Sequence, residues 1–236
     1  MEDIYSAGFV RALFNEMSGS YERVNFITSF GFSERWRKAC LSRAASAEGH
    51  SALDLMTGMG ESWPYLLPAL GASGTLHAVD FSPGMLEHAR ARSEEFSGYK
   101  VHIKEEDALA TSVGEGSVDR VYSLFGLKTL NGDQTRRLAQ EIRRVLKPSG
   151  EFSLIEVSVP GNPMLRFFYM FYLKVGIPIL GRLFLGNPDN YRMLGIYTER
   201  FGNSLAAVEA FREAGLDAHY HEYFFGCATG ISGTKN

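Results

Sequence analysis

The chain has 236 residues, of which 45% are hydrophobic and 22% charged, and its formal net charge is −3. This composition is typical of a soluble globular protein and gives no electrostatic basis for binding nucleic acid. Two cysteines without a Cys-x-x-Cys pair or a Cys/His cluster argue against a metal site and a disulfide scaffold. Early acidic residues and no long apolar run at the N-terminus argue against a secretory signal, so we expect a cytoplasmic protein.

Helical patterns come first, over residues 8–47, with a break at Gly31. From residue 51 onward, strand and helix patterns alternate. Strands are predicted at 51–56, 75–80, 99–105, 118–125, 151–157, 217–225 and 226–232, and helices at 61–70, 83–96, 133–146 and 204–214. Ser62 is the predicted N-cap of the 61–70 helix, Ser82 begins the next helix, and residues 147–150 form a turn.

Helices and loop are expected over residues 162–200, which include the very apolar stretch 164–185. Three basic residues and three helix breakers interrupt that stretch: Arg166, Lys174, Arg182, Gly176, Pro178 and Gly181. A spanning helix needs about 20 nearly uncharged residues. We therefore predict two short amphipathic helices, which can contact a membrane surface without crossing the membrane.

Five strand-then-helix units followed by a terminal pair of strands predict an α/β fold. Its open sheet is mostly parallel with an antiparallel C-terminal strand, and helices cover both faces. We expect a single domain over residues 1–236, with a helical cap at 1–48 and a helical lid at 160–202. The carboxyl ends of the parallel strands meet at one edge of such a sheet, where the cap is free to cover them.

A glycine turn follows the first of these strands, in LDLMTGMG at residues 53–60. The apolar run ends in Asp54, Gly58 and Gly60 form a tight turn, and Asp80 ends the next strand. This arrangement is typical of a nucleotide-type cofactor site at the carboxyl end of a parallel sheet.

The residue in the place of the third glycine of a dinucleotide fingerprint is Trp63, and no phosphate-binding loop is present. A bulky indole disfavours a dinucleotide, so a nucleoside without a phosphate chain is expected, and S-adenosylmethionine fits. We expect Asp80 to accept from both ribose hydroxyls and Asp107, just after the third strand, to accept from the adenine amino group.

Further motifs occur along the chain. They are YERVNFITSFGFSERWR at 21–37, AVDFSPGMLEHARAR at 78–92, SLFGLKTL at 123–130, RVLKPSGEFSLIEVS at 144–158 and NPDNYRML at 187–194. Together they resemble the ubiquinone/menaquinone-biosynthesis C-methyltransferase (UbiE-type) family over roughly residues 10–235. The resemblance implies a class I methyltransferase, whose Rossmann-like sheet binds S-adenosyl-L-methionine beneath a helical cap.

The cofactor site is expected to use residues of the cap, the glycine turn and the ends of the second, third and fourth strands. The candidates are Tyr21, Asp54, Thr57, Gly58, Gly60, Asp80, Phe81, Met85, Asp107, Ala108 and Ser123. Tyr21 is expected to close over the cofactor.

The acceptor site is where the chain departs from the family pattern. Lys128-Thr129 replaces Arg-Asn after Phe-Gly-Leu, and Ser33-Glu34 replaces His-Arg. Tyr197 and Glu199 replace a serine and an arginine, and Ser149 replaces a glycine farther away. The first three changes predict an acceptor ring, or ring substituents, different from those of the family's quinones.

Three residues are candidates for catalysis. The resemblance places Lys128 near the acceptor, where it can act as a base or as a cation beside a phenolate. Tyr197 can meet the ring, and His221 lies with His219 on one face of a late strand. The apolar 164–185 stretch suits a greasy or prenylated substrate.

The function expected is transfer of a methyl group from S-adenosylmethionine to a carbon atom of a hydrophobic quinol- or phenol-like acceptor. Two alternatives remain open: a natural-product or lipid methyltransferase acting on oxygen or nitrogen, and a cofactor-binding protein of this fold without methyl transfer. An NAD-dependent oxidoreductase is disfavoured by Trp63. A homodimer is compatible with the sequence.

Overall fold

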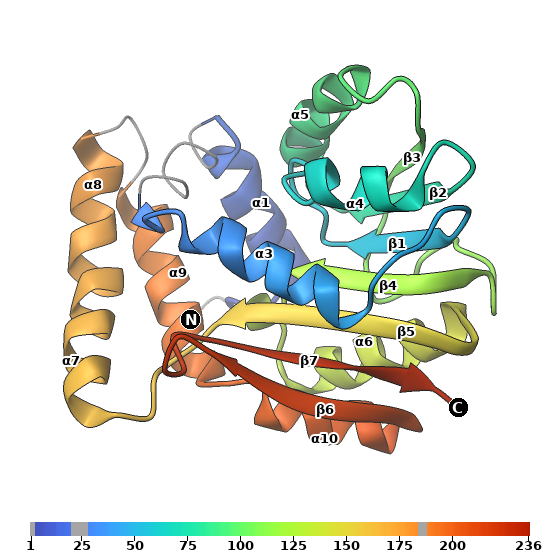
Figure 1. Cartoon of the computed structure of the whole chain (residues 1–236). Coiled ribbons are helices and arrows are strands. Elements are labelled where there is room, and N and C mark those ends of the chain that lie inside the picture. Colours follow the sequence, from blue (N-terminus) through green and yellow to red (C-terminus); the bar gives the residue numbers. More distant parts are fainter. Residues whose placement is uncertain (1–2, 20–27, 184–187) are drawn as a thin grey trace.

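The computed structural model describes residues 3–19, 28–183 and 188–236. Within them, one seven-stranded sheet runs through the molecule, with helices on both faces (Figure 1). The strands are β1 (Ser51–Leu55), β2 (Thr75–Asp80), β3 (Lys100–Glu105), β4 (Val118–Leu124), β5 (Leu146–Val157), β6 (Leu216–Tyr223) and β7 (Ala228–Lys235). The helices are α1 (Ala7–Met17), α3 (Phe32–Arg43), α4 (Trp63–Leu70), α5 (Pro83–Glu94), α6 (Gly132–Val145), α7 (Pro163–Phe171), α8 (Ile177–Leu183), α9 (Pro188–Phe201) and α10 (Leu205–Glu213).

The strand order is β3-β2-β1-β4-β5-β7-β6, and β1 to β5 are parallel to one another. β7 pairs antiparallel with both β5 and β6, which confirms the predicted sheet type. This antiparallel strand is the last in the chain but lies one place inside the edge of the sheet. Gly233 permits this insertion, because a Cβ atom there would lie 1.7 Å from the carbonyl oxygen of Asp217 in β6.

Two apolar layers hold the sheet between its helices. Successive strand residues point to opposite faces, so Leu53 and Leu55 pack towards α6 and α10, whereas Ala52 packs towards α4 and α5. In Figure 1 the parallel strands point towards α1 and the α7–α9 group, which lie beyond their carboxyl ends, while α3 packs across the face of β4 and β5. The predicted site edge is therefore the edge that these helices cover.

β5 begins at Leu146, five residues before the predicted strand, because Leu146 already pairs with Val118. The expected turn at 147–150 is an irregular part of this strand, where the register shifts between Val118 and Arg120. Ser149 has a φ of 62°, the left-handed region that favours glycine.

The lid differs from the two short helices predicted for 164–185. Residues 163–183 are one helical run, in which a π-helical turn, Tyr172–Gly176, joins α7 to α8. The backbone N–H of Ile177 donates to the carbonyl oxygen of Tyr172. This wider turn lets the helix continue through Pro178, which has no backbone N–H to donate. By length and composition, the part Pro163–Leu180 is the one helix of the described residues that could cross a membrane.

Candidate active site

The glycine turn after β1 lies at the carboxyl edge of the sheet. Gly58 and Gly60 have φ angles of 59° and 78°, which side chains rarely adopt. A Cβ atom on Gly60 would lie 2.6 Å from the indole of Trp63. Gly60 thus makes room for the tryptophan that stands in place of a third glycine, and this indole is fully buried.

Asp54 is a buried acceptor at the centre of this turn. Its Oδ2 atom accepts from the hydroxyls of Thr57 (2.6 Å) and Ser62 (2.8 Å) and from the indole N–H of Trp63 (3.3 Å). Burial raises the pKa of Asp54 to about 6. Ser62 precedes α4 as predicted, but its side chain makes no capping hydrogen bond and instead donates to Asp54.

Asp80 is held by two backbone donors at the end of β2. The N–H of Gly58 donates to its Oδ2 atom and the N–H of Ser82 to its Oδ1 atom, each at 2.9 Å. Burial, which outweighs these hydrogen bonds, raises its pKa to about 6. Within the described parts of the chain, no ion pair neutralises Asp54 or Asp80. Two buried carboxylates without a cation suit a positively charged ligand.

Two cavities, of about 60 and 340 Å³, lie along this edge and share Val10, Met56, Phe81 and Thr129 as walls. The predicted cofactor residues on the smaller cavity are Asp54, Thr57, Gly58, Asp80, Phe81 and Met85. Phe81, Asp107 and Ala108 line the larger one. Gly60, in the same turn, lines neither cavity. Ser123 lines neither cavity and buries its hydroxyl without a hydrogen-bond partner, and Tyr21 falls outside the described residues.

The helix α1 covers the two cavities and is fixed by specific contacts. Asn15 Oδ1 accepts from the hydroxyl of Ser82 (2.6 Å) and from the N–H of Gly84 (3.1 Å), at the start of α5. The hydroxyl of Tyr197 donates to the carbonyl oxygen of Ile4. Tyr197, a candidate for catalysis, is fully buried in this packing and lines none of the three cavities.

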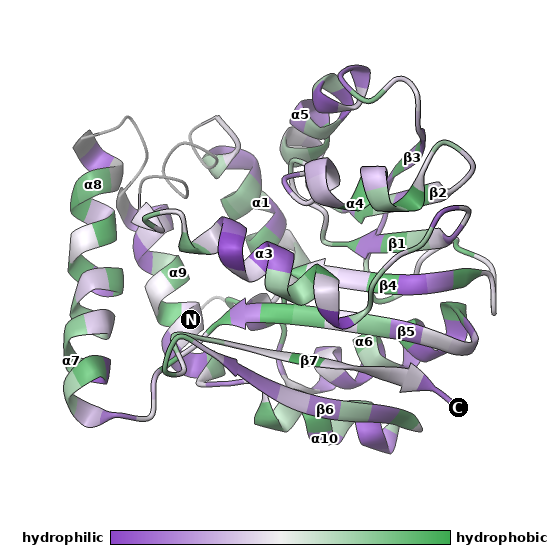
Figure 2. Cartoon of the chain, viewed as in Figure 1, coloured by the Kyte–Doolittle hydropathy of each residue, from purple (hydrophilic) through white to green (hydrophobic). Residues whose placement is uncertain are grey.

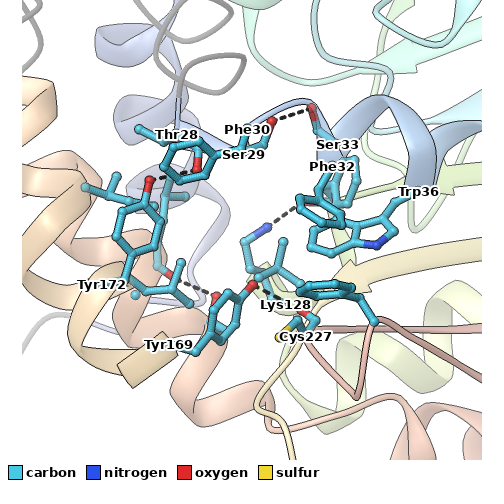
Figure 3. Close-up of a pocket in the computed structure, with 18 of the residues that line it drawn as sticks. Thr28, Ser29, Phe30, Phe32, Ser33, Trp36, Lys128, Tyr169, Tyr172 and Cys227 are labelled. Atoms are coloured by element: carbon cyan, nitrogen blue, oxygen red, sulfur yellow. Dashed lines mark hydrogen bonds between the residues drawn. The ribbon is translucent and has the colours of Figure 1, made fainter. Parts of the chain in front are cut away.

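A third cavity, of about 380 Å³, lies between α3, the α7–α9 group and the turn joining β6 to β7. Its walls are mainly aromatic and aliphatic, as expected for an apolar ligand. It shares Arg37 and Phe125 with the smaller cofactor cavity, so the two spaces meet there. Figure 3 shows the side chains around it, with the amine of Lys128 among the rings.

Lys128 lies in the short 3₁₀ helix Leu127–Thr129 and is 5% exposed. Its Nζ atom donates to the carbonyl oxygen of Phe125 (2.7 Å) and to Oε1 of Glu156 (2.8 Å). An ammonium has three donors, so these two bonds leave one for a ligand in the cavity. Glu156 is fully buried and also accepts from the backbone N–H of Lys128 at 3.0 Å.

Glu156 and Arg37 are site residues that the sequence reasoning did not select. Glu156 ends β5 as Asp54 and Asp80 end their strands, and that shared position was the available signal. Arg37 belongs to the Trp-basic motif of residues 21–37. Its guanidinium lies 5.3 Å from the centre of the Phe125 ring and 3.5 Å from Glu61 Oε1.

The other acceptor candidates separate in space. Ser33 lines the acceptor cavity and Thr129 the cofactor cavities. Glu199 instead pairs with Lys174 at 2.6 Å, away from all three cavities. His221 also lines none of them and contacts the Ser232 hydroxyl at 2.6 Å. His219 lies on the exposed side of β6 near Asp217.

Strained backbone accompanies the acceptor cavity. Phe30, Phe125 and Phe224 line it with φ angles of 50°, 70° and 45°. Such conformations cost roughly 1–3 kcal/mol each and persist where the surrounding structure imposes them, often at functional sites. The described residues contain no group of three or more His, Cys, Asp or Glu side chains able to hold a metal ion.

Comparison with known proteins relates this geometry to a family. The sequence model described as the ubiE/COQ5 methyltransferase family matches residues 1–235. A demethylmenaquinone methyltransferase of Lactococcus lactis is 33% identical over 96% of this chain and 90% of its own. A ubiquinone/menaquinone biosynthesis C-methyltransferase UbiE of Desulfotalea psychrophila is 29% identical over 92% and 86%. The structure of a SAM-dependent methyltransferase from Aquifex aeolicus shares the fold, with a TM-score of 0.60 at 18% identity over 85% and 89% of the two chains.

Proposed function

The chain belongs to the ubiE/COQ5 methyltransferase family and uses S-adenosyl-L-methionine, and from this premise we propose that it methylates a ring carbon of an apolar hydroxyaromatic acceptor. A reduced quinone of the demethylmenaquinone type is the first candidate acceptor, since the relative from Lactococcus lactis, similar over 96% of the chain, is a demethylmenaquinone methyltransferase. The observation that carries the proposal is the position of Lys128, a buried cation on the wall of an apolar cavity that meets the cofactor site.

The cofactor end of the site fits a cationic nucleoside. S-adenosylmethionine supplies an electrophilic methyl group on a positively charged sulfur. Asp54 and Asp80 are buried carboxylates whose raised pKa values reflect burial without a neutralising cation. The proposal assigns the ribose hydroxyls to Asp80, which lines the smaller cavity, and the adenine to Asp107, which lines the adjoining one.

At the acceptor end, Lys128 is the charged donor that lies among the rings, whereas Arg37 lies where the cavity meets the cofactor site. The third donor of Lys128 is proposed to bind the oxygen of the acceptor and to stabilise it as a phenolate. The hydroxyl proton leaves to solvent, and the negative charge spreads to the ring carbons beside and opposite that oxygen, which become nucleophilic. With the cofactor bound, one of these carbons would take the methyl group while the C–S bond breaks to leave a neutral thioether, and loss of that carbon's own proton to solvent would restore the aromatic ring. Tyr169 and Tyr172 do not compete as bases, since burial raises the pKa of each phenol and both donate to backbone carbonyls.

Glu156 has the role of a positioning residue. Its carboxylate accepts hydrogen bonds from the ammonium and from the backbone N–H of Lys128. The backbone N–H of Val157 also donates to it, at 2.7 Å. These bonds aim the lysine at the cavity. Alignment of the ring and exclusion of water by the apolar walls supply the rest of the rate enhancement, which can amount to several kcal/mol.

Methyl transfer from labelled S-adenosylmethionine to a panel of acceptors tests the function. The panel holds reduced demethylmenaquinone, simple naphthols and phenols, and an amine- and a hydroxyl-bearing lipid. Labelled carbon on a quinol or phenol ring supports the proposal, and the position is read by NMR. Label on oxygen or nitrogen, or cofactor binding without transfer to any acceptor, would sink it.

A further inference from the structure

The outer face of the helical run 163–183 is unusually apolar for a surface. Its exposed large side chains follow helical spacing and form what we call the outer stripe: Met164, Phe167, Phe168, Phe171, Val175 and Ile179. Phe167 is 69% and Phe171 60% exposed. Only 11% of the Pro163–Leu180 window is buried, whereas the core helix of a globular protein is mostly buried. Figure 2 shows this helical column, at the left, as largely apolar or neutral in hydropathy.

A second group of exposed rings surrounds the mouth of the acceptor cavity. Phe30, Phe168 and Phe224 line that cavity, yet each is at least half exposed, and the ring of Phe225 lies 5.6 Å from that of Phe224. We call these four residues the aromatic rim. Phe224 and Phe225 both have positive φ angles, 45° and 55°, so the turn holds two rings outward at a conformational cost.

The stretch of chain that carries the outer stripe has charged residues of one sign. Residues 157–188 contain no Asp or Glu, but they contain Arg166, Lys174 and Arg182. Arg166 and Arg182 are exposed, whereas Lys174 is paired with Glu199 of α9. A helix with an apolar face and only basic charges is the pattern that binds anionic lipid at the level of the headgroups.

The inner side of the same helical run is hydrogen-bonded to the rest of the protein. The hydroxyl of Tyr169 donates to the carbonyl oxygen of Cys227 (3.1 Å) and that of Tyr172 to the carbonyl oxygen of Thr28 (2.8 Å). Both rings line the acceptor cavity. With its inner side tied to the body of the protein in this way, the helix presents only its outer side to a bilayer and would lie along the surface.

We propose that the outer stripe and the aromatic rim dock on the surface of an anionic bilayer, so that the acceptor passes from the lipid directly into its cavity. A protein partner on this face would close the mouth of the cavity. A bilayer is instead the phase in which an apolar acceptor dissolves, and the basic residues complement its charge. Delivery of the acceptor from the lipid rests on the proposed function, but docking of the protein on the bilayer does not.

Flotation of the full-length protein with vesicles tests the docking. Binding is expected to vesicles of phosphatidylcholine with roughly one third phosphatidylglycerol, and to be weaker by tenfold or more to pure phosphatidylcholine, because about 1 kcal/mol is contributed by each basic residue near an anionic surface. The variant Phe167→Ser/Phe171→Ser is expected to lose more than tenfold of the affinity for the anionic vesicles. Leu205→Ser, which removes an exposed leucine of α10, is the matched control and should bind as the parent does.

Four outcomes decide the proposal. Absence of binding to the anionic vesicles, or equal binding of the Phe167→Ser/Phe171→Ser variant, would overturn it. A dimer in analytical ultracentrifugation that this variant dissociates would overturn it as well, in favour of a second copy of the chain on this face. Vesicle binding lost only in that variant supports it, and this holds even where no acceptor is methylated, so the two proposals fail separately.

The same variants give a second reading through activity. With a short, water-soluble naphthol as acceptor, Phe167→Ser/Phe171→Ser should turn over as the parent does, because neither side chain lines the cavity. With an acceptor dissolved in anionic vesicles, its turnover should fall more than tenfold. Equal losses with both acceptors would contradict delivery from the lipid.

Discussion

The two halves of the site adjoin at Arg37 and Phe125, but they are built in opposite ways. In the cofactor half, the partners of the two acids come from the strand ends and the glycine turn: Asp54 accepts from residues within nine positions of itself, and Asp80 from Ser82 and from the turn after β1. The acceptor half is assembled from segments far apart in the chain, including α3, α7 and the turn after β6. Local motifs therefore fix the donor, and long-range packing fixes what can receive the methyl group.

The two halves also differ in electrostatics. Among the described residues, the buried acids Asp54 and Asp80 of the cofactor half have no ion-pair partner, whereas Lys128 of the acceptor half is already paired with Glu156. The first arrangement is completed by a cationic ligand. The second is complete by itself and offers a directed positive charge to a ligand that is otherwise apolar.

Of the variants considered, Lys128→Met is expected to give the largest difference between its effect on turnover and its effect on cofactor affinity. Loss of one donor to a developing oxyanion typically costs about 100-fold in kcat, and cofactor affinity, measured by calorimetry, should stay within about twofold. The substitution also leaves Glu156 buried without its partner, which costs about 3–5 kcal/mol.

The double variant Lys128→Met/Glu156→Gln controls for that loss of stability. It should recover the melting temperature but not the turnover, whereas Lys128→Arg, which keeps the charge, should retain part of the activity. Recovery of turnover in the double variant would show that Lys128 has only a structural role.

Asp80→Asn should act on the opposite half. It removes the charge from the proposed ribose contact, and we expect the dissociation constant of S-adenosylmethionine to rise more than tenfold by calorimetry. Asp119→Asn is the matched control, since Asp119 lies at the far end of the sheet, where it pairs with Lys147. An equal loss in both variants would assign the effect to stability rather than to the site.

Acidification should weaken the cofactor half selectively. Burial raises the pKa of Asp54 and Asp80 from 3.8 to about 6 in the folded protein. The stability that these groups give the free protein is therefore present below pH 3.8 and lost as the pH rises through about 6. A cationic ligand prefers the ionised carboxylates, so its affinity should fall roughly tenfold for one protonated group between pH 7.5 and 5.

Calorimetry and melting curves over that pH range measure this effect. The rise in melting temperature on adding the cofactor should grow with pH. Asp80→Asn should flatten the dependence, since one titrating group is gone. A pH-independent affinity in the parent protein would contradict binding of the cation by these two carboxylates.

The smallest effect is expected outside both halves, at Ser149. Its φ of 62° is the left-handed conformation, which costs a residue with a Cβ atom about 1–2 kcal/mol. Ser149→Gly should raise the melting temperature by a few degrees and leave cofactor affinity and turnover unchanged. Ser149→Ala retains the Cβ atom and should give no gain, and stabilisation by both variants would show that the serine side chain, not the backbone, is the cause.

The residue pattern by itself determined the succession of strands and helices along the chain, the mostly parallel sheet and the edge of the sheet that carries the site. Apolar runs ending in Asp54 and Asp80 could be read because strand alternation and glycine turns are short-range signals. Glu156 followed the same pattern at the end of β5. It escaped notice because its partner, Lys128, is 28 residues away.

Only the tertiary structure decided which acceptor candidates face the cavity. Tyr197 and His221 had suitable chemistry, but packing turned the first towards Ile4 and the second towards Ser232. For the lid, the sequence likewise predicts two separate helices, whereas in the structure a π-helical turn before Pro178 joins them into one helical run. Side-chain direction in a cap or lid depends on contacts between distant segments, because the free energy of packing, rather than local propensity, selects among conformations of similar intrinsic cost.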